Sequence, residues 1–285
     1  MTHTIHRSAA LLAALLAGCS GKEAGQPGAK APAAVAGPNV VTITATEYTF
    51  QMPAQVPAGP TTFLLKSQGR ELHHAVVVRL GEGKSAADLG AALKNPGPPP
   101  SWMHLEGGPN PPNPGGESNA TLDLKPGHYV VLCFIPSGDG MPHFAKGMVT
   151  PFEVIAAPGA AAAAMPAPDV VVRMTEYGYT LSTPLKAGAQ TIRVINEGKQ
   201  VHEVALARFA PGKGVPDLVA WEQGGAKGPP PGSLLGGSSP MEPGDTAQFT
   251  VALEPGDYVL ACFVPDAGDG KAHLAHGMAQ PVKIS

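Results

Sequence analysis

Short runs in which apolar and polar residues alternate, or in which β-branched residues cluster, recur along this chain. Six such runs cover residues 39–50, 60–67, 73–80, 169–180, 189–196 and 202–209. A period of two residues is typical of a strand that buries one face. Two more strands are expected in each half, on either side of the loops that follow Cys133 and Cys262. The pattern therefore predicts a chain built mainly of short β-strands.

Two stretches break this pattern and predict short helices. The first is "SAADLGAALK", residues 85–94, with Ser85 as its N-cap, and the second is "VPDLVAWEQ", residues 215–223. A loop rich in proline and glycine follows each of them. Seven or so short strands with one helix on a long crossover predict an all-β Greek-key sandwich in each half of the chain.

The two halves repeat one another. "SQGRELHHAVVVRL" returns as "NEGKQVHEVALARF", and "PGHYVVLCF" returns as "PGDYVLACF", each 129 residues later. After the cysteine the offset becomes 130, which one inserted residue explains. A period of this length indicates tandem domains rather than a solenoid. We expect one domain at 39–156 and a second at 169–285.

The ends and joints of these domains have a different composition. Residues 1–18 carry a short apolar run and read as a signal peptide, because the run is too short to span a bilayer. "LAGC" resembles a bacterial lipobox, which implies lipidation of Cys19. Residues 19–38 then form a flexible tether, and residues 157–168 form an Ala/Pro-rich linker.

These features predict an exported protein, held in the cell envelope by its N-terminal lipid. The residue after the anchor cysteine is Ser20 rather than Asp, which favours the periplasmic face of the outer membrane. The chain has 19 Lys and Arg against 22 Asp and Glu, a formal net charge of −3. It has no basic run or basic patch with interleaved aromatic residues, so nucleic acid is not an expected partner.

The duplication shows which chemically active residues are kept. Two histidines, one cysteine and one methionine have a counterpart of the same type: His73 and His202, Cys133 and Cys262, His143 and His273, Met148 and Met278. Other histidines face a different residue in the other repeat and are expected at the surface: His74, His104, His128 and His276. A plane of two histidines and one cysteine with a weak axial methionine suits copper that cycles between Cu(I) and Cu(II).

Each repeat resembles a cupredoxin, the type 1 (blue) copper family. The resemblance rests on "GHYVVLC" and "GDYVLAC", in which a strand ends at the cysteine, and on a histidine followed four residues later by Gly-Met. It implies one copper bound by His73, Cys133, His143 and Met148, and a second bound by His202, Cys262, His273 and Met278. Nine and ten residues separate cysteine from histidine, more than in familiar members, so the sites are expected to be less rigid or more open.

The resemblance also implies roles for three further pairs: bracing of the ligand loop by Ser67 and Asn196, packing by Tyr129 and Tyr258, and an apolar docking patch at Phe144 and Leu274 beside a solvent-facing second histidine. Other interpretations stay open. One is that Cys133 and Cys262 form a disulfide, and another is that the domains fold without metal. Multicopper oxidases and nitrite reductases also use tandem domains, but they need additional histidines. No His-x-His pair follows the leader, so the chain is expected not to be an enzyme.

The leading expectation is therefore electron transfer by a lipoprotein with up to two copper ions, one in each domain. Its partner would be a redox protein of the cell envelope. The alternatives are a copper-handling protein that buffers copper or delivers it to an acceptor, and a metal-free interaction module. The membrane is expected to be contacted only through the lipid at Cys19.

Overall fold

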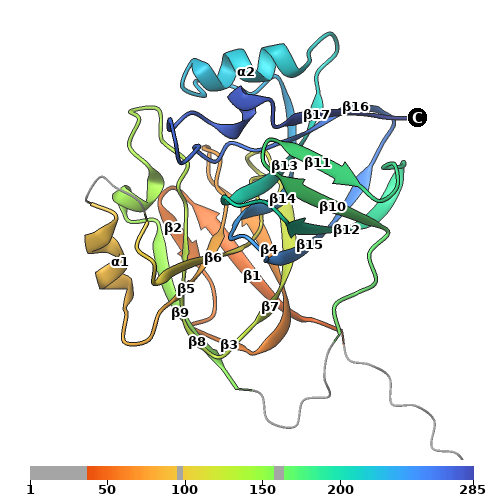
Figure 1. The fold of residues 1–285 in the computed structure, drawn as a ribbon. Coiled ribbons are helices and arrows are strands. Elements are labelled where there is room, and N and C mark those ends of the chain that lie inside the picture. Colours follow the sequence, from red (N-terminus) through yellow and green to blue (C-terminus); the bar gives the residue numbers. More distant parts are fainter. Residues whose placement is uncertain (1–36, 95–98, 157–163) are drawn as a thin grey trace, which may run out of the picture. The chain divides into compact units, whose positions relative to one another are not determined.

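The computed structural model describes residues 37–94, 99–156 and 164–285, whose strands form two sheets (Figure 1). The first sheet has eight strands in the order β11 (Gly178–Leu181), β10 (Val170–Thr175), β12 (Gly188–Asn196), β15 (Thr246–Leu253), β7 (Glu117–Leu124), β4 (Gly59–Ser67), β1 (Asn39–Thr46) and β2 (Thr49–Gln51). The second has nine, in the order β17 (Ala279–Ile284), β16 (Gly256–Ala261), β13 (His202–Phe209), β14 (Gly232–Met241), β6 (Met103–Gly107), β5 (Val76–Leu80), β8 (Gly127–Leu132), β9 (Val149–Ile155) and β3 (Gln55–Pro57).

Both sheets run through both repeats. In the first sheet β7 pairs with β15 at Thr121 and Gln248, and in the second β6 pairs with β14 at Glu106 and Met241. The predicted all-β fold class is confirmed. The repeats share their sheets and belong to one compact unit, so the boundaries predicted between them stay a prediction.

Alternation of buried and exposed residues explains why these segments form strands. In β4 every second side chain faces inward, and Phe63 and Leu65 are fully buried. Their counterparts in the second repeat, Ile192 and Val194 of β12, belong to the same hydrophobic core. Burying one face of each strand is the main contribution to stability in such sheets. The cysteines and methionines predicted as ligands lie in this core.

Both predicted helices are present. α1 (Ala86–Ala92) begins after Ser85, whose Oγ accepts from the Asp88 backbone N–H at 3.2 Å. The Asp88 carboxylate in turn accepts from the Ser85 N–H at 2.9 Å, which completes a capping box. α2 is Val215–Gln223. Each helix packs one buried leucine, Leu89 or Leu218, against the outer face of the second sheet.

The predicted leader, the tether up to residue 36 and the anchor residue Cys19 lie outside the described residues, as do residues 157–163 of the linker. Within the ranges that the structure describes, no helix is long and apolar enough to cross a membrane.

Candidate metal centres

Four side chains of the first repeat converge where strands of the second sheet end. His73 lies in the loop before β5, and Cys133 directly follows β8. His143 begins η1, a 3-10 helix (His143–Lys146), and Met148 directly precedes β9. None of the four side chains is exposed to solvent. The strand ends therefore hold the predicted ligands in a dry pocket of the core.

The nitrogen and sulfur atoms of this first set face one another. His73 Nδ1 lies 3.1 Å from His143 Nδ1, and Cys133 Sγ lies 3.4 Å from His143 Nδ1. One metal-ligating atom from each of the three residues lies within 4.8 Å of the other two. Because the two Nδ1 atoms face one another, the Nε2 of each ring faces away from the other predicted ligands.

The second repeat builds the same arrangement from His202, Cys262, His273 and Met278, all of them fully buried. His202 Nδ1 lies 3.0 Å from His273 Nδ1, and Cys262 Sγ lies 3.4 Å from His273 Nδ1. η2 is the 3-10 helix His273–His276, and Met278 directly precedes β17. The duplication in sequence is therefore a duplication of geometry. As metal ligands, the eight residues stay a prediction.

The spacing of these atoms fits a shared metal ion. Two imidazole nitrogens about 2.0 Å from one ion, at an angle of about 100°, are separated by about 3.1 Å. The nitrogen pairs of both sites have this separation. A thiolate, two imidazoles and a thioether form the donor set that copper prefers over hard cations. The residues present therefore fit a copper ion.

Burial fixes the protonation of the ligands in the metal-free chain. It lowers the pKa of His73 and of His202 to about 4, with the neighbouring histidine as a further cause. Both rings are then neutral at neutral pH, the form that binds metal. Burial also raises the pKa of the Cys133 thiol to about 12 and raises that of Cys262. These thiols need a cation beside them to lose their protons.

The two cysteines are unpaired and lie in separate sites, which contradicts the disulfide interpretation. Their thiols are the sulfur donors of two separate histidine pairs rather than partners of each other. This arrangement leaves each sulfur available to a metal.

The long loops between cysteine and histidine do not open the sites. In the first repeat Pro136 and Pro142 form an isolated antiparallel bridge, and the His143 N–H donates to the Ile135 carbonyl at 2.9 Å. The matching loop of the second repeat forms the same small hairpin. The extra residues project outward from its base, while the histidine returns to the metal pocket. The expectation of a more open site is therefore wrong.

Glycines let the backbone close around the ligands. Gly147 and Gly277, with φ of 105° and 99°, end the 3-10 helices in the left-handed region and turn the chain toward the methionine. In the loop before the first histidine, a Cβ on Gly69 would lie 2.6 Å from His73 Nε2. A Cβ on Gly198 would lie 2.8 Å from His202 Nε2. No larger residue fits at these two positions without displacing the ring.

The residue after the first histidine holds the cysteine loop. His74 Nε2 accepts from the Phe134 backbone N–H at 2.8 Å, and Glu203 Oε1 accepts from the Phe263 N–H at 2.9 Å. Both side chains are buried, so the expectation that His74 lies at the surface is wrong. Sequence comparison missed this pair because the residue types differ, although both are hydrogen-bond acceptors in the same position.

The two predicted bracing residues differ in what they do. Asn196 Nδ2 donates to the carbonyls of Gln200 and Met241, each at 2.9 Å, and its Oδ1 accepts from the Gly198 N–H at 3.0 Å. Asn196 therefore braces the loop that carries His202, as predicted. The Ser67 hydroxyl is buried and has no hydrogen-bond partner, so the same prediction is wrong for Ser67.

The second histidine of each site is covered rather than exposed. Tyr48 lies over His143 with ring centroids 5.2 Å apart, and Tyr177 lies over His273 at 5.4 Å. Leu274 is itself buried. The prediction of a solvent-facing histidine is therefore wrong, and so is the docking role of Leu274. Phe144 is partly exposed, so its docking role stays a prediction. The sequence signal for this cover was the Glu-Tyr pair that both repeats keep at the end of their first strand.

Carboxylates reach the outer nitrogens of these rings in different ways. Glu71 Oε2 lies 2.7 Å from His143 Nε2. The aligned residue of the second repeat is Gln200, which donates to Asp266 at 2.9 Å. The Asp266 carboxylate stops 3.8 Å from His273 Nε2, beyond hydrogen-bonding distance. The two centres therefore have the same metal-facing atoms and different outer surroundings.

A third group of side chains that could bind a metal lies between the repeats. His104 Nε2 lies 2.8 Å from Asp245 Oδ2, and Glu106 lies within 4.8 Å of both ligand atoms. The His104 side chain is 34% exposed, so it lies at the surface as predicted. Arg79 pairs with Glu106 at 2.5 Å and neutralises part of the charge. The group brings a histidine of one repeat to a carboxylate of the other without any sequence motif.

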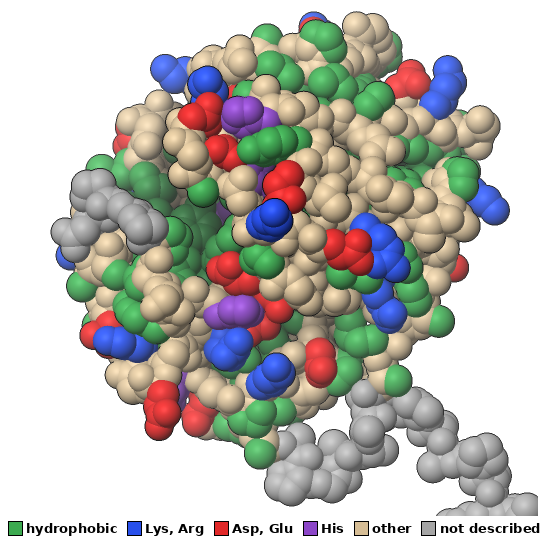
Figure 2. All heavy atoms as spheres, in the orientation of Figure 1, with side chains coloured by type: hydrophobic (Ala, Val, Ile, Leu, Met, Phe, Trp, Pro, Cys, Tyr) green, Lys and Arg blue, Asp and Glu red, His purple; other side chains and the backbone are tan. Residues whose placement is uncertain are grey.

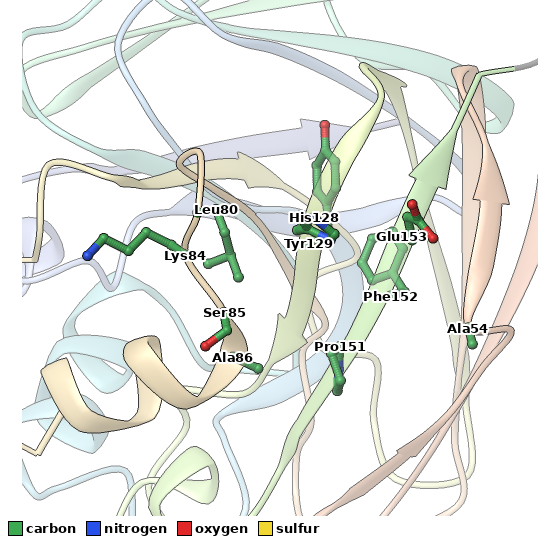
Figure 3. Close-up of a pocket in the computed structure, with 11 residues that line it drawn as sticks. Ala54, Leu80, Lys84, Ser85, Ala86, His128, Tyr129, Pro151, Phe152 and Glu153 are labelled. Atoms are coloured by element: carbon green, nitrogen blue, oxygen red, sulfur yellow. The ribbon is translucent and has the colours of Figure 1, made fainter.

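One surface pocket lies away from both centres (Figure 3). Its lining includes Lys84 and Ser85 at the start of α1, His128 of β8 and Glu153 of β9. None of the eight predicted ligands lines it.

Comparison with known proteins gives structural likeness only. No family model matches the chain, and no curated protein matches it. Among solved structures, it is similar to an auracyanin of Roseiflexus castenholzii, with 24% identity over 43% of this chain and 100% of that chain, and a TM-score of 0.31. It is also similar to a multicopper oxidase, with 14% identity over 86% and 88% of the two chains and a TM-score of 0.25. A copper nitrite reductase of Nitrosomonas europaea has 12% identity over 87% and 93%, and a TM-score of 0.25. Likeness at this level does not by itself assign a function.

The comparison does correct one expectation. An oxidase and a nitrite reductase are enzymes, and they align with more than four fifths of this chain. The expectation that the chain is not an enzyme is therefore contradicted and is withdrawn. It rested on the lack of a His-x-His pair, but His104, Glu106 and Asp245, whose side chains are of types that can bind metal, lie together between the repeats although no sequence motif connects them.

Proposed function

We propose that this chain is a copper protein that transfers electrons, with a type 1-like site in each repeat. The first site consists of His73, Cys133, His143 and Met148, and the second consists of His202, Cys262, His273 and Met278. The observation that carries the proposal is the convergence, twice, of two Nδ1 atoms and one Sγ in a pocket without exposed ligand atoms.

The chain prepares both sites before any metal binds. Strand ends and 3-10 helices orient the rings, the cysteine loops are held by hydrogen bonds from Phe134 and Phe263, and the core excludes water. When bound, copper supplies a Cu(I)/Cu(II) couple that takes one electron from a reduced redox partner and gives one to an oxidised partner. A preformed site suits this chemistry because the ligands move little between the two oxidation states.

Burial favours electron transfer over copper delivery. A copper chaperone hands its ion to an acceptor by ligand exchange, for which the thiolate must be reachable. Cys133 and Cys262 have no exposed surface, and the second histidines are covered by Tyr48 and Tyr177. The printed name of an auracyanin that resembles 42% of this chain describes a "blue" copper protein, which agrees with the proposal.

The proposal includes the cell envelope as the place of action. Lipidation at Cys19 would hold the chain at the periplasmic face of the outer membrane, where a redox protein partner would meet it. On the face that Figure 2 shows, basic and acidic side chains are interspersed rather than gathered by sign. Such a surface supports a partner that recognises shape and mixed polarity rather than one strong charge.

Copper titration of the full reduced chain tests the proposal. We would add Cu(II), count the bound ions, and record visible absorption and electron paramagnetic resonance. Cys133→Ser and Cys262→Ser serve as matched controls, because each removes the sulfur from one site only. We expect two ions with thiolate charge-transfer absorption and the loss of one ion's signal in each variant.

Other results would contradict the proposal in distinct ways. Tight binding without charge-transfer absorption would point to copper handling through another coordination. Charge-transfer absorption from one site alone would contradict the proposed type 1-like site in the other repeat. No stoichiometric binding would leave a metal-free interaction module as the remaining interpretation.

A further inference from the structure

The segments that carry the first histidine of each site meet at the repeat interface. Ala75, two residues after His73, is fully buried, and its backbone N–H donates to the Pro109 carbonyl at 3.0 Å. Pro109 forms an isolated antiparallel bridge with Ser238 of the second repeat. One hydrogen bond therefore joins the segment of His73 to a residue that pairs with the other repeat.

Asn110 completes the connection to the second site. It follows Pro109 in the chain, and its side chain is 1% exposed. Its Nδ2 donates to Glu203 Oε2 at 3.0 Å and to the backbone carbonyl of the next residue at 3.2 Å. Glu203 directly follows His202. Covalent bonds and two hydrogen bonds therefore join His73 to His202 in an unbroken route.

The same route has a branch to each cysteine. The backbone N–H after Cys133 donates to His74 Nε2 at 2.8 Å, and the backbone N–H after Cys262 donates to Glu203 Oε1 at 2.9 Å. His74 and Glu203 belong to the route, because each follows the first histidine of its site. The proposed sulfur ligand of each site therefore lies in a segment that is one hydrogen bond from the route.

Two glycines let the backbones along this route approach closely. A Cβ on Gly108 would lie 2.1 Å from the Ala75 carbonyl oxygen, and a Cβ on Gly237 would lie 1.9 Å from the Val204 carbonyl oxygen. The two glycines have φ of 127° and 117° and occupy equivalent positions of the two repeats. No side chain fits at either place. The route is therefore tightly packed, which keeps its geometry fixed.

Apolar side chains make a second contact between the surroundings of the sites. Leu72 precedes the first histidine of its repeat and packs against the hydrophobic cluster of the second repeat that contains Leu218 and Leu274. Val201 has the same place in the second repeat and packs against a hydrophobic cluster of the first repeat that contains Leu89. Each loop that carries a first histidine therefore reaches into the other repeat.

We propose that the two copper sites exchange electrons within one chain, along the route from His73 through Asn110 to His202. Such exchange rests on the proposed function, because it needs a copper ion in each site. Electrons tunnel more readily through covalent bonds and hydrogen bonds than across gaps, and this route consists of such bonds alone. Its side chains are buried, so water does not compete for the two hydrogen bonds that cross from segment to segment.

The surroundings of the second histidines set the direction of the transfer. Glu71 Oε2 lies 2.7 Å from His143 Nε2, and a carboxylate in this place favours Cu(II). In the second site the Asp266 carboxylate stops 3.8 Å from His273 Nε2. One electron therefore passes from Cu(I) at the first site, which becomes Cu(II), to Cu(II) at the second site, which becomes Cu(I). No proton or group moves with it. A reduced redox protein supplies the electron to the first site, and an oxidised one takes it from the second.

The first test needs no metal and asks whether Asn110 holds the route together. We would measure amide hydrogen exchange of Phe263 in the metal-free chain and in Asn110→Ala. Without Asn110 Nδ2, Glu203 loses one of the two hydrogen bonds that the structure gives its carboxylate, so exchange of the Phe263 amide should rise about tenfold. Asn119→Ala is the matched control, because Asn119 also crosses the interface, with hydrogen bonds to the Thr250 backbone at 2.8 and 2.9 Å, and should leave this amide unchanged.

The second test measures electron exchange in the copper-loaded chain. Met148→Gln replaces the weak axial sulfur of the first site by an amide oxygen, which separates the two sites in absorption and in potential. In this background a short radiolysis pulse reduces a small fraction of both sites at random. The later redistribution of electrons between the two absorption bands gives the rate of exchange. We expect a first-order rate that does not depend on protein concentration, with a severalfold loss in Asn110→Ala and no loss in Asn119→Ala.

Two further measurements guard against a trivial result. Dipolar electron paramagnetic resonance should give the same distance between the two Cu(II) ions in both variants, which separates a broken route from displaced repeats. If Asn110→Ala does not fold, Asn110→Ser replaces it in both tests, since Ser239 is the equivalent residue of the second repeat.

The outcomes separate the two proposals. Two bound copper ions that exchange electrons only at a rate proportional to protein concentration, or equally fast in Asn110→Ala, would overturn the route and leave the proposed function intact. Unchanged exchange of the Phe263 amide in Asn110→Ala would overturn the role of Asn110, whatever the copper result. Absence of copper binding would overturn the proposed function and the electron exchange together.

Discussion

Glu71 Oε2 lies 2.7 Å from the outer nitrogen of His143, while the aligned residue of the other repeat, Gln200, makes no contact of this kind with His273. A carboxylate that accepts from the outer N–H of a metal-bound imidazole raises the basicity of the ring. The two centres, alike in their metal-facing atoms, are therefore expected to differ in potential. The site of the first repeat should favour Cu(II) more strongly.

Substitution of Glu71 by Gln tests this difference. In a Cys262→Ser background, where only the first site remains, we expect Glu71→Gln to lower Cu(II) affinity by about 10- to 100-fold and to raise the reduction potential. Competitive titration and redox titration measure the two effects. Glu117→Gln removes an exposed carboxylate of the same repeat and should change neither quantity. Equal Cu(II) affinity and equal reduction potential in the two variants would contradict the expected effect of Glu71.

The metal-free chain should lose stability in mild acid. Burial holds the pKa of His73 and His202 near 4 in the folded state, below the ordinary value of 6.5. The unfolded chain then binds more protons than the folded chain between these values, so the free energy of unfolding falls as pH decreases from about 6.5 to 4. Each histidine contributes up to about 3 kcal/mol of this loss.

Urea denaturation at several pH values between 7.5 and 4 measures the slope. His73→Gln should unfold with a shallower dependence on pH, because one of the two groups no longer titrates. An unfolding free energy that stays constant across this range would contradict the assignment. Copper-loaded protein should resist the same acidification longer, since the ion competes with protons for Nδ1.

The convergence of the proposed metal ligands was predictable because chemistry allows few substitutes for such residues. A thiolate or an imidazole nitrogen at Cys133 or His143 has no equivalent among other residue types, so both repeats keep the same residue at these positions. Hydrogen-bond acceptors are interchangeable. His74 and Glu203 do the same work with different side chains, and comparison of the repeats discarded both.

The joining of the repeats was not predictable from periodicity. Alternation shows which residues of a strand face the core, but it does not show which strand lies beside it. The pairs that join the sheets, at Thr121 with Gln248 and at Glu106 with Met241, link residues more than a hundred positions apart. The composition of the linker likewise says nothing about strand pairing. It indicated flexibility, while the strands on either side of the linker belong to sheets that both repeats share.

The loop before the first histidine should not tolerate a side chain. A Cβ on Gly198 would lie 2.8 Å from both His202 Nε2 and Cδ2. We expect Gly198→Ala to displace the ring and to weaken copper binding at the second site, with the first site unchanged. Copper counting in a Cys133→Ser background checks this. Gly90→Ala is the control, since Gly90 lies in α1 with open space at its Cβ position. Alanine has a higher helix propensity than glycine, so this substitution should stabilise α1 slightly. Full copper binding by Gly198→Ala would show that the loop backbone moves and that the His202 ring stays in place.

The buried tyrosines before the cysteines should act on stability and not on metal. Tyr258 is 1% exposed, and its hydroxyl donates to the Glu254 carbonyl four residues earlier at 2.8 Å, as Tyr129 does to Lys125 at 2.9 Å. This contact ties the turn before β16 to the strand that ends at Cys262. Phe keeps the ring but loses two hydrogen bonds, the one donated to the Glu254 carbonyl and the one accepted from the Glu254 backbone N–H at 3.1 Å. Tyr258→Phe should therefore lower the unfolding free energy by about 1–2 kcal/mol and leave the copper spectrum unchanged. Denaturation of the metal-free chain, followed by copper titration of the same sample, measures both. A changed spectrum at equal stability would instead make Tyr258 part of the metal site.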